Sequence, residues 1–351
     1  MKVLLHGDLF ITNQVLRAAI EKTFEGSGIT FEYDYLTDDW PVVPVQETDE
    51  VREFVGSDEL IVPKVADVEM IATHSAPITR RVIEAAKFLK VVGAARGGPV
   101  NINSRACTER GIPVVYAPGR NSGAVAEHTV ALILAETRSV ARAHISLMQE
   151  MRWRGDLYVF EKVGLELNSA VVGIIGFGAI GRKVAHILAG GFGSKILAYD
   201  PYVPAEEITR LGYRPVSLEE LLRESDIISL NARLTPQTRG MLGEREFGLV
   251  KKSAYLVNTA RGELIQHEHL YRALQEKRLA GAALDVFEAE PPPPESPIYQ
   301  LDNVTATTHL GGASIQAAEI GADIMAGEIY KFLVSGETPK YCVNPEVFAR
   351  P

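Results

Sequence analysis

The chain is poor in cysteine, has no long apolar run and carries no excess of positive charge, and each shortage excludes a class of protein. Its two cysteines, Cys107 and Cys342, are too few for a disulfide framework, which favours a reducing cytoplasm. The apolar run at the N-terminus is broken by His6 and Asp8, unlike a secretory signal. No uncharged stretch approaches the length of a membrane-spanning helix, so we expect no membrane contact. The formal net charge of −9 argues against nucleic acid as a partner, because phosphates bind to basic surfaces.

The remaining pattern is that of an α/β protein. Short apolar runs alternate with helical patterns, which is typical of parallel sheets whose strands are joined by helices. A chain of 351 residues is long for a single core. The sequence therefore predicts two Rossmann-like or flavodoxin-like parallel-sheet domains with an active-site cleft between them. Strands are expected at 2–5, 29–33, 68–72, 90–93 and 114–116, and again at 171–175, 195–199, 226–230, 254–257, 281–284 and 304–305.

Two helical patterns mark the domain boundaries. One runs from Gly123 to about Glu150 and is longer than an ordinary surface helix, so we expect it to link domains or to contact another subunit. The other runs from Ser314 to about Val334 and is expected to return to the first domain. These boundaries predict one domain of residues 1–120 plus 315–351 and a second domain of residues 121–314.

A glycine loop suggests the cofactor. Gly176-Phe177-Gly178-Ala179-Ile180-Gly181 lies between the expected strand Val171–Ile175 and a helical pattern that begins at Ala179. Glycines let the backbone approach a pyrophosphate, and the helix N-terminus favours the anion there. The alternative is a glycine-rich turn with no ligand. We predict a dinucleotide at Gly176, Gly178, Ala179, Ile180 and Gly181.

An acidic residue selects between NAD and NADP. Asp200 ends the next expected strand, nineteen residues after Gly181. A carboxylate there can accept hydrogen bonds from the ribose hydroxyls and would repel a 2′-phosphate. Pro201 and Tyr202 follow, so no arginine stands ready to receive that phosphate. The sequence predicts NAD. We therefore expect residues 121–314 to form the NAD-binding Rossmann domain and residues 1–120 plus 315–351 to form the substrate domain.

Three residues near the C-terminal end suggest the chemistry. Arg261 follows Asn-Thr-Ala, Glu290 closes an Asp-Val-Phe segment, and His309 precedes Leu-Gly-Gly. A guanidinium can hold a carboxylate with two parallel hydrogen bonds, and an imidazole can move a proton near neutral pH. A carboxylate beside that imidazole can orient it and raise its pKa. The alternatives are a surface ion pair, a loop charge and a structural histidine.

Five segments of the chain resemble the D-isomer-specific 2-hydroxyacid dehydrogenase family, which includes phosphoglycerate, glycerate and D-lactate dehydrogenases. The resemblance covers nearly the whole chain and implies an NAD-dependent enzyme that interconverts a D-2-hydroxy acid and a 2-oxo acid by hydride transfer. It also implies a homodimer formed through residues 121–160. The segments are Val171–Gly181, Leu234–Gly240, Leu256–Gly262, Gly281–Pro291 and His309–Gly312.

The resemblance implies a role for each matching residue. Arg261 is expected to bind the carboxylate and oxo group of the substrate, and His309 to act as general acid and base with Glu290 as its partner. Asp285 is expected to contact the nicotinamide amide. The other residues expected at the cofactor are Thr259, Ala260 and Gly312.

The expected substrate loop departs from the family pattern. The family uses backbone amides of a first-domain loop for the substrate carboxylate, and the matching amides here belong to Gly97 and Gly98. Arg96 stands where a small residue is frequent, either as a second cation for a dianionic substrate or as an arginine that braces the loop. His74 stands where phosphoglycerate dehydrogenases often have an arginine, which counts against that substrate. All four residues are candidate substrate contacts.

Two other functions remain open on the same fold. Formate dehydrogenases have glutamine where this chain has Glu290, which makes that activity a weak alternative. NAD-sensing corepressor-like scaffolds keep the trio, so the trio alone does not exclude a binding function. The eight histidines show no metal-ligand spacing, so no metal site is expected.

Overall fold

The computed structural model describes residues 1–349, which divide into two compact units. Unit 1 comprises residues 1–121 and the chain from 313 onward, and unit 2 comprises residues 122–312. Among the described residues, no helix is long and apolar enough to cross a membrane.

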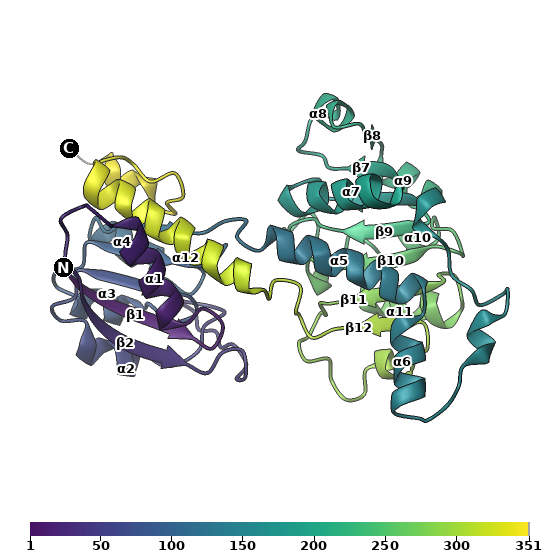
Figure 1. Cartoon of the computed structure of the whole chain (residues 1–351), viewed down its shortest axis with the longest axis horizontal. Helices are drawn as coiled ribbons and strands as arrows, with labels where there is room; N and C mark the ends of the chain where they lie inside the picture. Colours follow the sequence, from purple (N-terminus) through teal and green to yellow (C-terminus); the bar gives the residue numbers. More distant parts are fainter. Residues whose placement is uncertain (350–351) are drawn as a thin grey trace. The chain divides into compact units, whose positions relative to one another are not determined.

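Unit 1 is built on a parallel five-stranded sheet (Figure 1). The strand order β2-β1-β3-β4-β5 is that of flavodoxin-like folds. Its strands are β1 (Lys2–Asp8), β2 (Glu32–Asp38), β3 (Met70–Thr73), β4 (Val91–Ala94) and β5 (Val114–Tyr116). Its helices are α1 (Asn13–Thr23), α2 (Asp58–Ile61), α3 (Arg80–Ala85), α4 (Ser104–Glu109) and α12 (Ile315–Tyr330).

Both faces of this sheet are covered by helices. Helices α1 and α12 lie on one face, where Leu16 and Met325 pack with strand residues such as Leu5. Helices α2, α3 and α4 cover the opposite face, where Ile83 packs with Val92. Coverage of both faces explains why the central strands are continuous apolar runs. The chain that leaves β1 continues to β2 on one side of the sheet, and the chain that leaves β3 continues to β4 on the other side. The carboxyl ends of β1 and β3 therefore form the topological switch point of unit 1.

Unit 2 is built on a parallel seven-stranded sheet. The order β12-β11-β10-β9-β6-β7-β8 is the Rossmann order extended by one strand. Its strands are β6 (Val171–Ile175), β7 (Lys195–Tyr199), β8 (Arg214–Pro215), β9 (Ile227–Leu230), β10 (Tyr255–Asn258), β11 (Gly281–Leu284) and β12 (Val304–Ala306). Its helices are α5 (Ser122–Thr137), α6 (Val140–Met148), α7 (Ala179–Phe192), α8 (Ala205–Arg210), α9 (Leu218–Glu224), α10 (Glu244–Phe247) and α11 (His267–Gln275).

The two faces of the second sheet also carry separate apolar clusters. Helices α5, α7 and α8 lie over one face, where Ile133 and Val184 pack with Ile174. Helices α9, α10 and α11 lie over the other, where Leu270 packs with Leu256. Helix α5 contacts β10, β11 and β12, whose carboxyl ends lead into the loops of the predicted trio.

The expected long helix from Gly123 to Glu150 is wrong, because α5 and α6 are separate helices. Ser139 has a left-handed backbone (φ 55°), which interrupts the helix between them. The carbonyl of Glu136 accepts a hydrogen bond from the Arg142 guanidinium and from the Ser139 amide. These donors take the place of the helical bond that would have continued α5.

Other differences are confined to boundaries and to one short strand. The expected strand at 29–33 is wrong in position, since β2 runs from Glu32 to Asp38. The apolar residues Ile29 and Phe31 pack against the core from the preceding connection, which explains the misleading signal. Strand β8 was not expected, because two residues leave no recognisable pattern.

Candidate active site

Glu290 and His309 form a hydrogen-bonded pair in unit 2. His309 Nδ1 lies 2.6 Å from Glu290 Oε2, and the other carboxylate oxygen accepts a hydrogen bond from the Phe287 amide at 3.0 Å. The two side chains are 47% and 37% exposed, so the pair is reachable from solvent. Because Nδ1 is taken by the carboxylate, Nε2 is the atom that can exchange a proton with a substrate.

The environment of this pair favours a protonated histidine. The hydrogen bond to Glu290 raises the pKa of His309, against burial and the positive charge of Arg261. Burial alone would raise the pKa of Glu290, but the hydrogen bond and charge of His309 outweigh it and the pKa is lowered. Both shifts stabilise an imidazolium beside a carboxylate.

Arg261 lies on the loop that follows β10. Asn258 shapes this loop, because its side chain donates to the Arg261 carbonyl at 2.9 Å and accepts from the Ala260 amide at 3.0 Å. The Arg261 side chain is exposed, and no carboxylate of residues 1–349 lies within 4.0 Å of its guanidinium. It is therefore an available cation whose charge acts on the His309 pair.

Gly262 brings two of these loops together. A Cβ at this position would lie 2.0 Å from the backbone of Phe287, so only glycine permits the approach. The close contact joins the loop of Arg261 to the segment that carries Glu290. All three members of the trio thus lie on loops after the carboxyl ends of strands in unit 2.

Asp285 anchors the loop of His309. His309 has a left-handed backbone (φ 59°), and its amide donates to the Asp285 carbonyl at 2.9 Å. The amides of Leu310 and Gly311 donate to the two oxygens of the Asp285 carboxylate, each at 2.8 Å. Burial alone would raise the pKa of this carboxyl, but the donors around it, including Thr307, lower it. A role in holding this loop was not foreseen for Asp285.

The glycine loop occupies the switch point of unit 2. Gly176 has φ 91°, and a Cβ there would lie 2.5 Å from the backbone amide of Ala232, which follows β9. Helix α7 begins at Ala179, and its first helical hydrogen bond comes from Arg182 to the Gly178 carbonyl. The amides of the first turn thus point out of the helix beside an exposed Gly178, which fits a pyrophosphate.

Asp200 lies beside this loop at the end of β7. Its carboxylate accepts hydrogen bonds from the Phe177 amide at 2.8 Å and the Tyr202 amide at 2.9 Å. A carboxylate has about four acceptor positions, so two remain for ribose hydroxyls. Together with the glycine loop, Asp200 fits NAD. Gly312 comes directly after Gly311, whose amide donates a hydrogen bond to the Asp285 carboxylate.

Thr259 and Ala260 precede Arg261 at the end of β10. Thr259 is buried, and its hydroxyl lies 2.7 Å from that of Thr129 on α5. Ala260 is half-buried and is held by its bond to Asn258. The backbone of this segment is thus fixed on both sides, as a contact to a nicotinamide would require.

Comparison with known proteins agrees with this geometry. Residues 130–311 match the family model for the NAD binding domain of D-isomer specific 2-hydroxyacid dehydrogenases. The chain is 35% identical to a glyoxylate reductase of Korarchaeum cryptofilum over 87% of its own length and 86% of that protein. The chain belongs to this family. The expected family and the NAD-binding nature of its second domain are confirmed.

Phosphoglycerate and D-lactate dehydrogenases are also among the proteins that the chain resembles. The chain is 41% identical to D-3-phosphoglycerate dehydrogenase of Methanocaldococcus jannaschii over 78% of its length, but covers 51% of that protein. It thus spans about half the length of the phosphoglycerate dehydrogenases that it matches. The apo-structure of D-lactate dehydrogenase from Escherichia coli aligns with 98% of the chain at a TM-score of 0.74 and 26% identity. The expected fold class of two parallel-sheet domains is confirmed.

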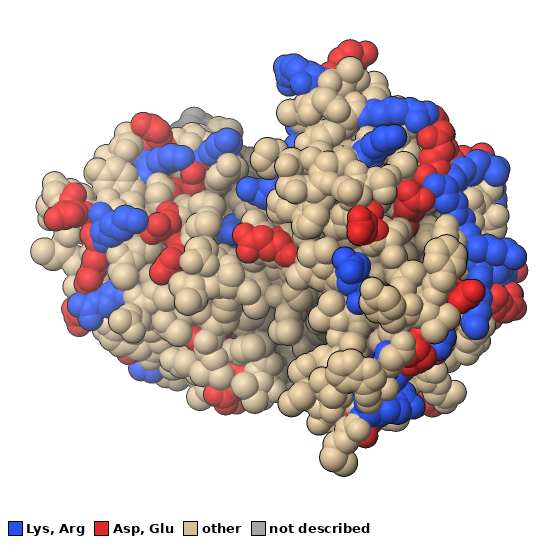
Figure 2. All heavy atoms as spheres, turned by 45° about the vertical axis from the view of Figure 1, so that its right-hand side comes forward, with Lys and Arg blue, Asp and Glu red and all other residues tan. Residues whose placement is uncertain are grey.

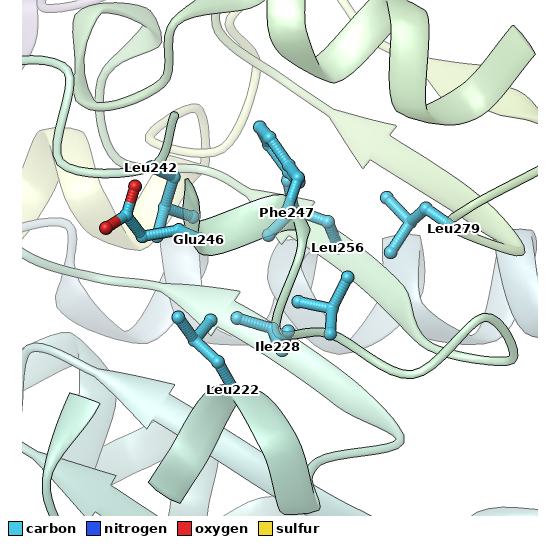
Figure 3. Close-up of a pocket in the computed structure, with 8 residues that line it drawn as sticks. Leu222, Ile228, Leu242, Glu246, Phe247, Leu256 and Leu279 are labelled. Atoms are coloured by element: carbon cyan, nitrogen blue, oxygen red, sulfur yellow. The ribbon is translucent and has the colours of Figure 1, made fainter. Parts of the chain in front are cut away.

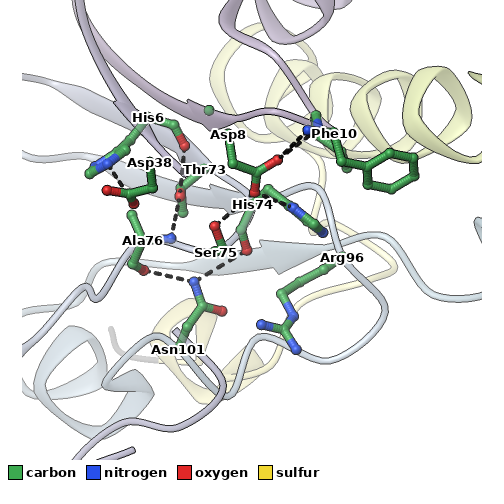
Figure 4. A network of polar contacts seen from close by, with 12 residues as sticks. His6, Asp8, Phe10, Asp38, Thr73, His74, Ser75, Ala76, Arg96 and Asn101 are labelled. Carbon is green, nitrogen blue, oxygen red and sulfur yellow. Dashed lines mark hydrogen bonds and ion pairs between the residues drawn. The ribbon is translucent and has the colours of Figure 1, made fainter. Parts of the chain in front are cut away.

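His74 lies at the switch point of unit 1, where it contacts Asp8. His74 Nδ1 is 2.6 Å from Asp8 Oδ2 (Figure 4). His74 Nε2 is 3.1 Å from the Arg120 guanidinium. An arginine can only donate, so Nε2 accepts and the proton resides on Nδ1. Burial and the neighbouring guanidinium charges lower the pKa of His74, although Asp8 opposes this. With both nitrogens engaged, His74 can act on a substrate only through Arg120.

Arg96 braces the loop at Glu53. Its guanidinium donates to the Glu53 carbonyl at 3.0 Å and forms an ion pair with the Glu53 carboxylate. Gly97 and Gly98 follow in an exposed loop, which leaves their backbone accessible. The structure thus favours the bracing role of the two alternatives for Arg96.

Sequence reasoning missed several polar residues that hold these loops. Asp8, Arg120, His128, Thr129 and Thr307 belong to no recognisable motif, and only the fold brings them to the site residues. Among residues 1–349, no group of three or more histidine, cysteine or acidic side chains is arranged to hold a metal ion.

An apolar gap in unit 2 is not part of this site. It lies between Leu222, Phe247, Leu256 and Leu279 (Figure 3) and has no room for a water molecule. No member of the trio lines it. It is a packing gap beneath α10 and not a ligand site.

Proposed function

We propose that the chain is an NAD-dependent D-2-hydroxyacid dehydrogenase that reduces a 2-oxo acid or oxidises the corresponding 2-hydroxy acid. The observation that carries this proposal is the pair of His309 and Glu290, solvent-accessible and 2.6 Å apart, together with the exposed guanidinium of Arg261, whose charge acts on the pair. Family membership supplies the cofactor class.

Each residue of the trio has a distinct task in the proposed reaction. Bound NADH supplies the hydride. Arg261 binds the carboxylate of the substrate and polarises its oxo group, because its guanidinium can donate two parallel hydrogen bonds. His309 donates the Nε2 proton to the oxo oxygen in reduction and takes a proton from the hydroxyl in oxidation. Glu290 stabilises the imidazolium and orients its ring.

The remaining predicted residues bind the two ligands in this proposal. The cofactor lies against Gly176, Gly178, Ala179, Ile180 and Gly181, with Asp200 at its ribose and Thr259, Ala260, Asp285 and Gly312 at its nicotinamide end. The substrate is held by backbone amides of Gly97 and Gly98, while Arg96 shapes their loop and His74 acts through Arg120.

The test is NADH oxidation by the purified protein with a panel of 2-oxo acids. The panel spans glyoxylate, pyruvate, hydroxypyruvate, its phosphate ester and bulkier or dicarboxylic acids, with Arg261→Ala as the control. We expect turnover of at least one acid by the natural protein and loss of at least 100-fold in the control, the order expected when a substrate-orienting cation is removed. NADH binding without turnover of any acid would contradict the proposal and favour an NAD-sensing scaffold.

We also propose that the protein is a homodimer formed through residues 121–160. Large apolar side chains are exposed along α6 and the segment that follows, at Ile145, Leu147, Met148, Met151, Trp153, Tyr158, Val159 and Phe160. Exposed apolar side chains that gather in one segment favour a protein interface. Charges of both signs alternate over the face shown in Figure 2. Sedimentation at micromolar concentration should give a dimer, and a monomer there would refute this assembly.

A further inference from the structure

The left-handed backbone of His309 needs support from its surroundings. A non-glycine residue is unfavourable in this region, because its Cβ lies too close to the backbone. The support comes from Asp285, which accepts hydrogen bonds from the amides of His309, Leu310 and Gly311. The orientation of the His309 ring toward Glu290 therefore depends on the position of the Asp285 carboxylate.

His128 of α5 fixes that carboxylate together with Thr307. The Thr307 hydroxyl donates to Asp285 Oδ1 at 2.6 Å. His128 Nε2 lies 3.1 Å from Thr307 Oγ1 and 3.3 Å from Asp285 Oδ1. Because the single hydroxyl proton of Thr307 goes to Asp285, the contacts of His128 require that Nε2 carries a proton and donates it.

The next residue of α5 reaches the loop of Arg261. The Thr129 hydroxyl donates to the Val125 carbonyl at 2.7 Å, so its contact with the Thr259 hydroxyl at 2.7 Å must be donated by Thr259. Thr129 and Thr259 are both buried, where an unmet hydroxyl costs stability. Thr259 stands two residues before Arg261, on the same turn.

We propose that His128 and Thr129 are positioning residues for the catalytic trio. His128 sets the loop of His309 through Asp285 and Thr307, and Thr129 sets the loop of Arg261 through Thr259. Among residues 1–349, neither His128 nor Thr129 forms a hydrogen bond or ion pair with a member of the trio. This inference rests on the proposed function, and it assigns to α5 the alignment of two loops that come from different strands.

Two variants of His128 test its proposed role in positioning the loop of His309. His128→Ala removes the donor, and His128→Gln keeps an N–H group near the position of Nε2. His186→Ala is the matched control, because His186 is an exposed histidine of α7 outside the site. Two variants of Thr129 test its proposed role in positioning the loop of Arg261. Thr129→Val removes the hydroxyl, and Thr129→Ser keeps it.

Turnover and its pH dependence should separate positioning from general stability. We expect His128→Ala to lower kcat about tenfold, since misplacement of a catalytic group is costly. The loss of activity at high pH should begin at lower pH, because a looser loop weakens the bond from His309 to Glu290. His128→Gln should recover most of both. Thr129→Val should raise KM for the acid, and Thr129→Ser should restore it.

The opposite results are equally specific. Unchanged kcat and pH profile in His128→Ala, or a loss that follows only the fraction of folded protein and is not recovered by His128→Gln, would overturn the inference. If the natural protein reduces no 2-oxo acid, the proposed function fails, and an NMR titration of the His309 ring then decides the positioning role alone. Its pKa should fall in His128→Ala, and an unchanged value would refute the role. Glu290, Arg261 and Asp285 are the charged groups that face this ring.

Discussion

Units 1 and 2 contain the same chemical pair with opposite consequences. In each, a histidine Nδ1 lies 2.6 Å from a carboxylate oxygen: His309 with Glu290 in unit 2, and His74 with Asp8 in unit 1. The pKa of His309 is raised, and the pKa of His74 is lowered. A short histidine–carboxylate contact is therefore not by itself the mark of a general acid.

Burial and the second ring nitrogen make the difference. His74 is 4% exposed and its Nε2 accepts from Arg120, which requires a neutral ring. His309 is half exposed, and its Nε2 has no hydrogen-bond partner within the described chain. The switch point of unit 1 is thus filled by its own side chains, whereas at that of unit 2 Gly178 is exposed and carries no side chain. Unit 2 leaves room for ligand chemistry where unit 1 has a structural core of polar groups.

Removal of His309 should have the largest effect on activity. We expect His309→Ala to lower kcat by about 10²- to 10⁴-fold, the usual contribution of a general acid, with little change in stability because its side chain is half exposed. Steady-state kinetics and thermal unfolding of the same preparation would measure both. A variant that retains most of its turnover would show that His309 is not the proton donor.

His74→Ala should act on stability. Its loss leaves the buried Asp8 carboxylate without one of its donors, which should cost about 3 kcal/mol of unfolding free energy. Denaturant unfolding measures this change, and Asp8→Asn, which removes the charge but keeps the shape, is the matched variant. A fully stable His74→Ala protein with altered substrate affinity would instead indicate a direct substrate contact.

Glu290→Gln should make His309 behave more like His74. Without the carboxylate, the pKa of His309 should fall, because the hydrogen bond to Glu290 is the main cause of its increase. Reduction needs protonated His309, so its rate should decline at lower pH than in the natural protein. Oxidation needs neutral His309 and should remain active to lower pH. Identical pH–rate profiles for the two proteins would exclude Glu290 as the partner that sets this pKa.

Arg96→Ala should have the smallest effect of the four. Its ion pair with the half-exposed Glu53 should contribute less than about 1 kcal/mol to stability. If Arg96 only braces the loop, KM should change alike for all 2-oxo acids. A selective loss for acids with a second negative group would instead make Arg96 a substrate cation.

Motif residues were predictable from the sequence, but their supports were not. The glycine loop and Arg261 could be recognised in the sequence, because close approach of the backbone to a pyrophosphate requires glycine and binding of a carboxylate favours arginine. Asp8 contacts His74, 66 residues away in the sequence, and His128 contacts Thr307, 179 residues away. Contacts over such separations leave no local sequence pattern. The break between α5 and α6 was also not predicted, although the Arg142 side chain that caps the Glu136 carbonyl is only six residues away.

An NMR titration of the ring protons of His309 and His74 in the natural protein tests the account most directly. We predict that His309 titrates above the ordinary value of about 6.5 and that His74 titrates below it, with each signal assigned by its loss in the alanine variant. A His309 that titrates below that value, or a His74 that titrates above it, would contradict the division of roles between the two pairs.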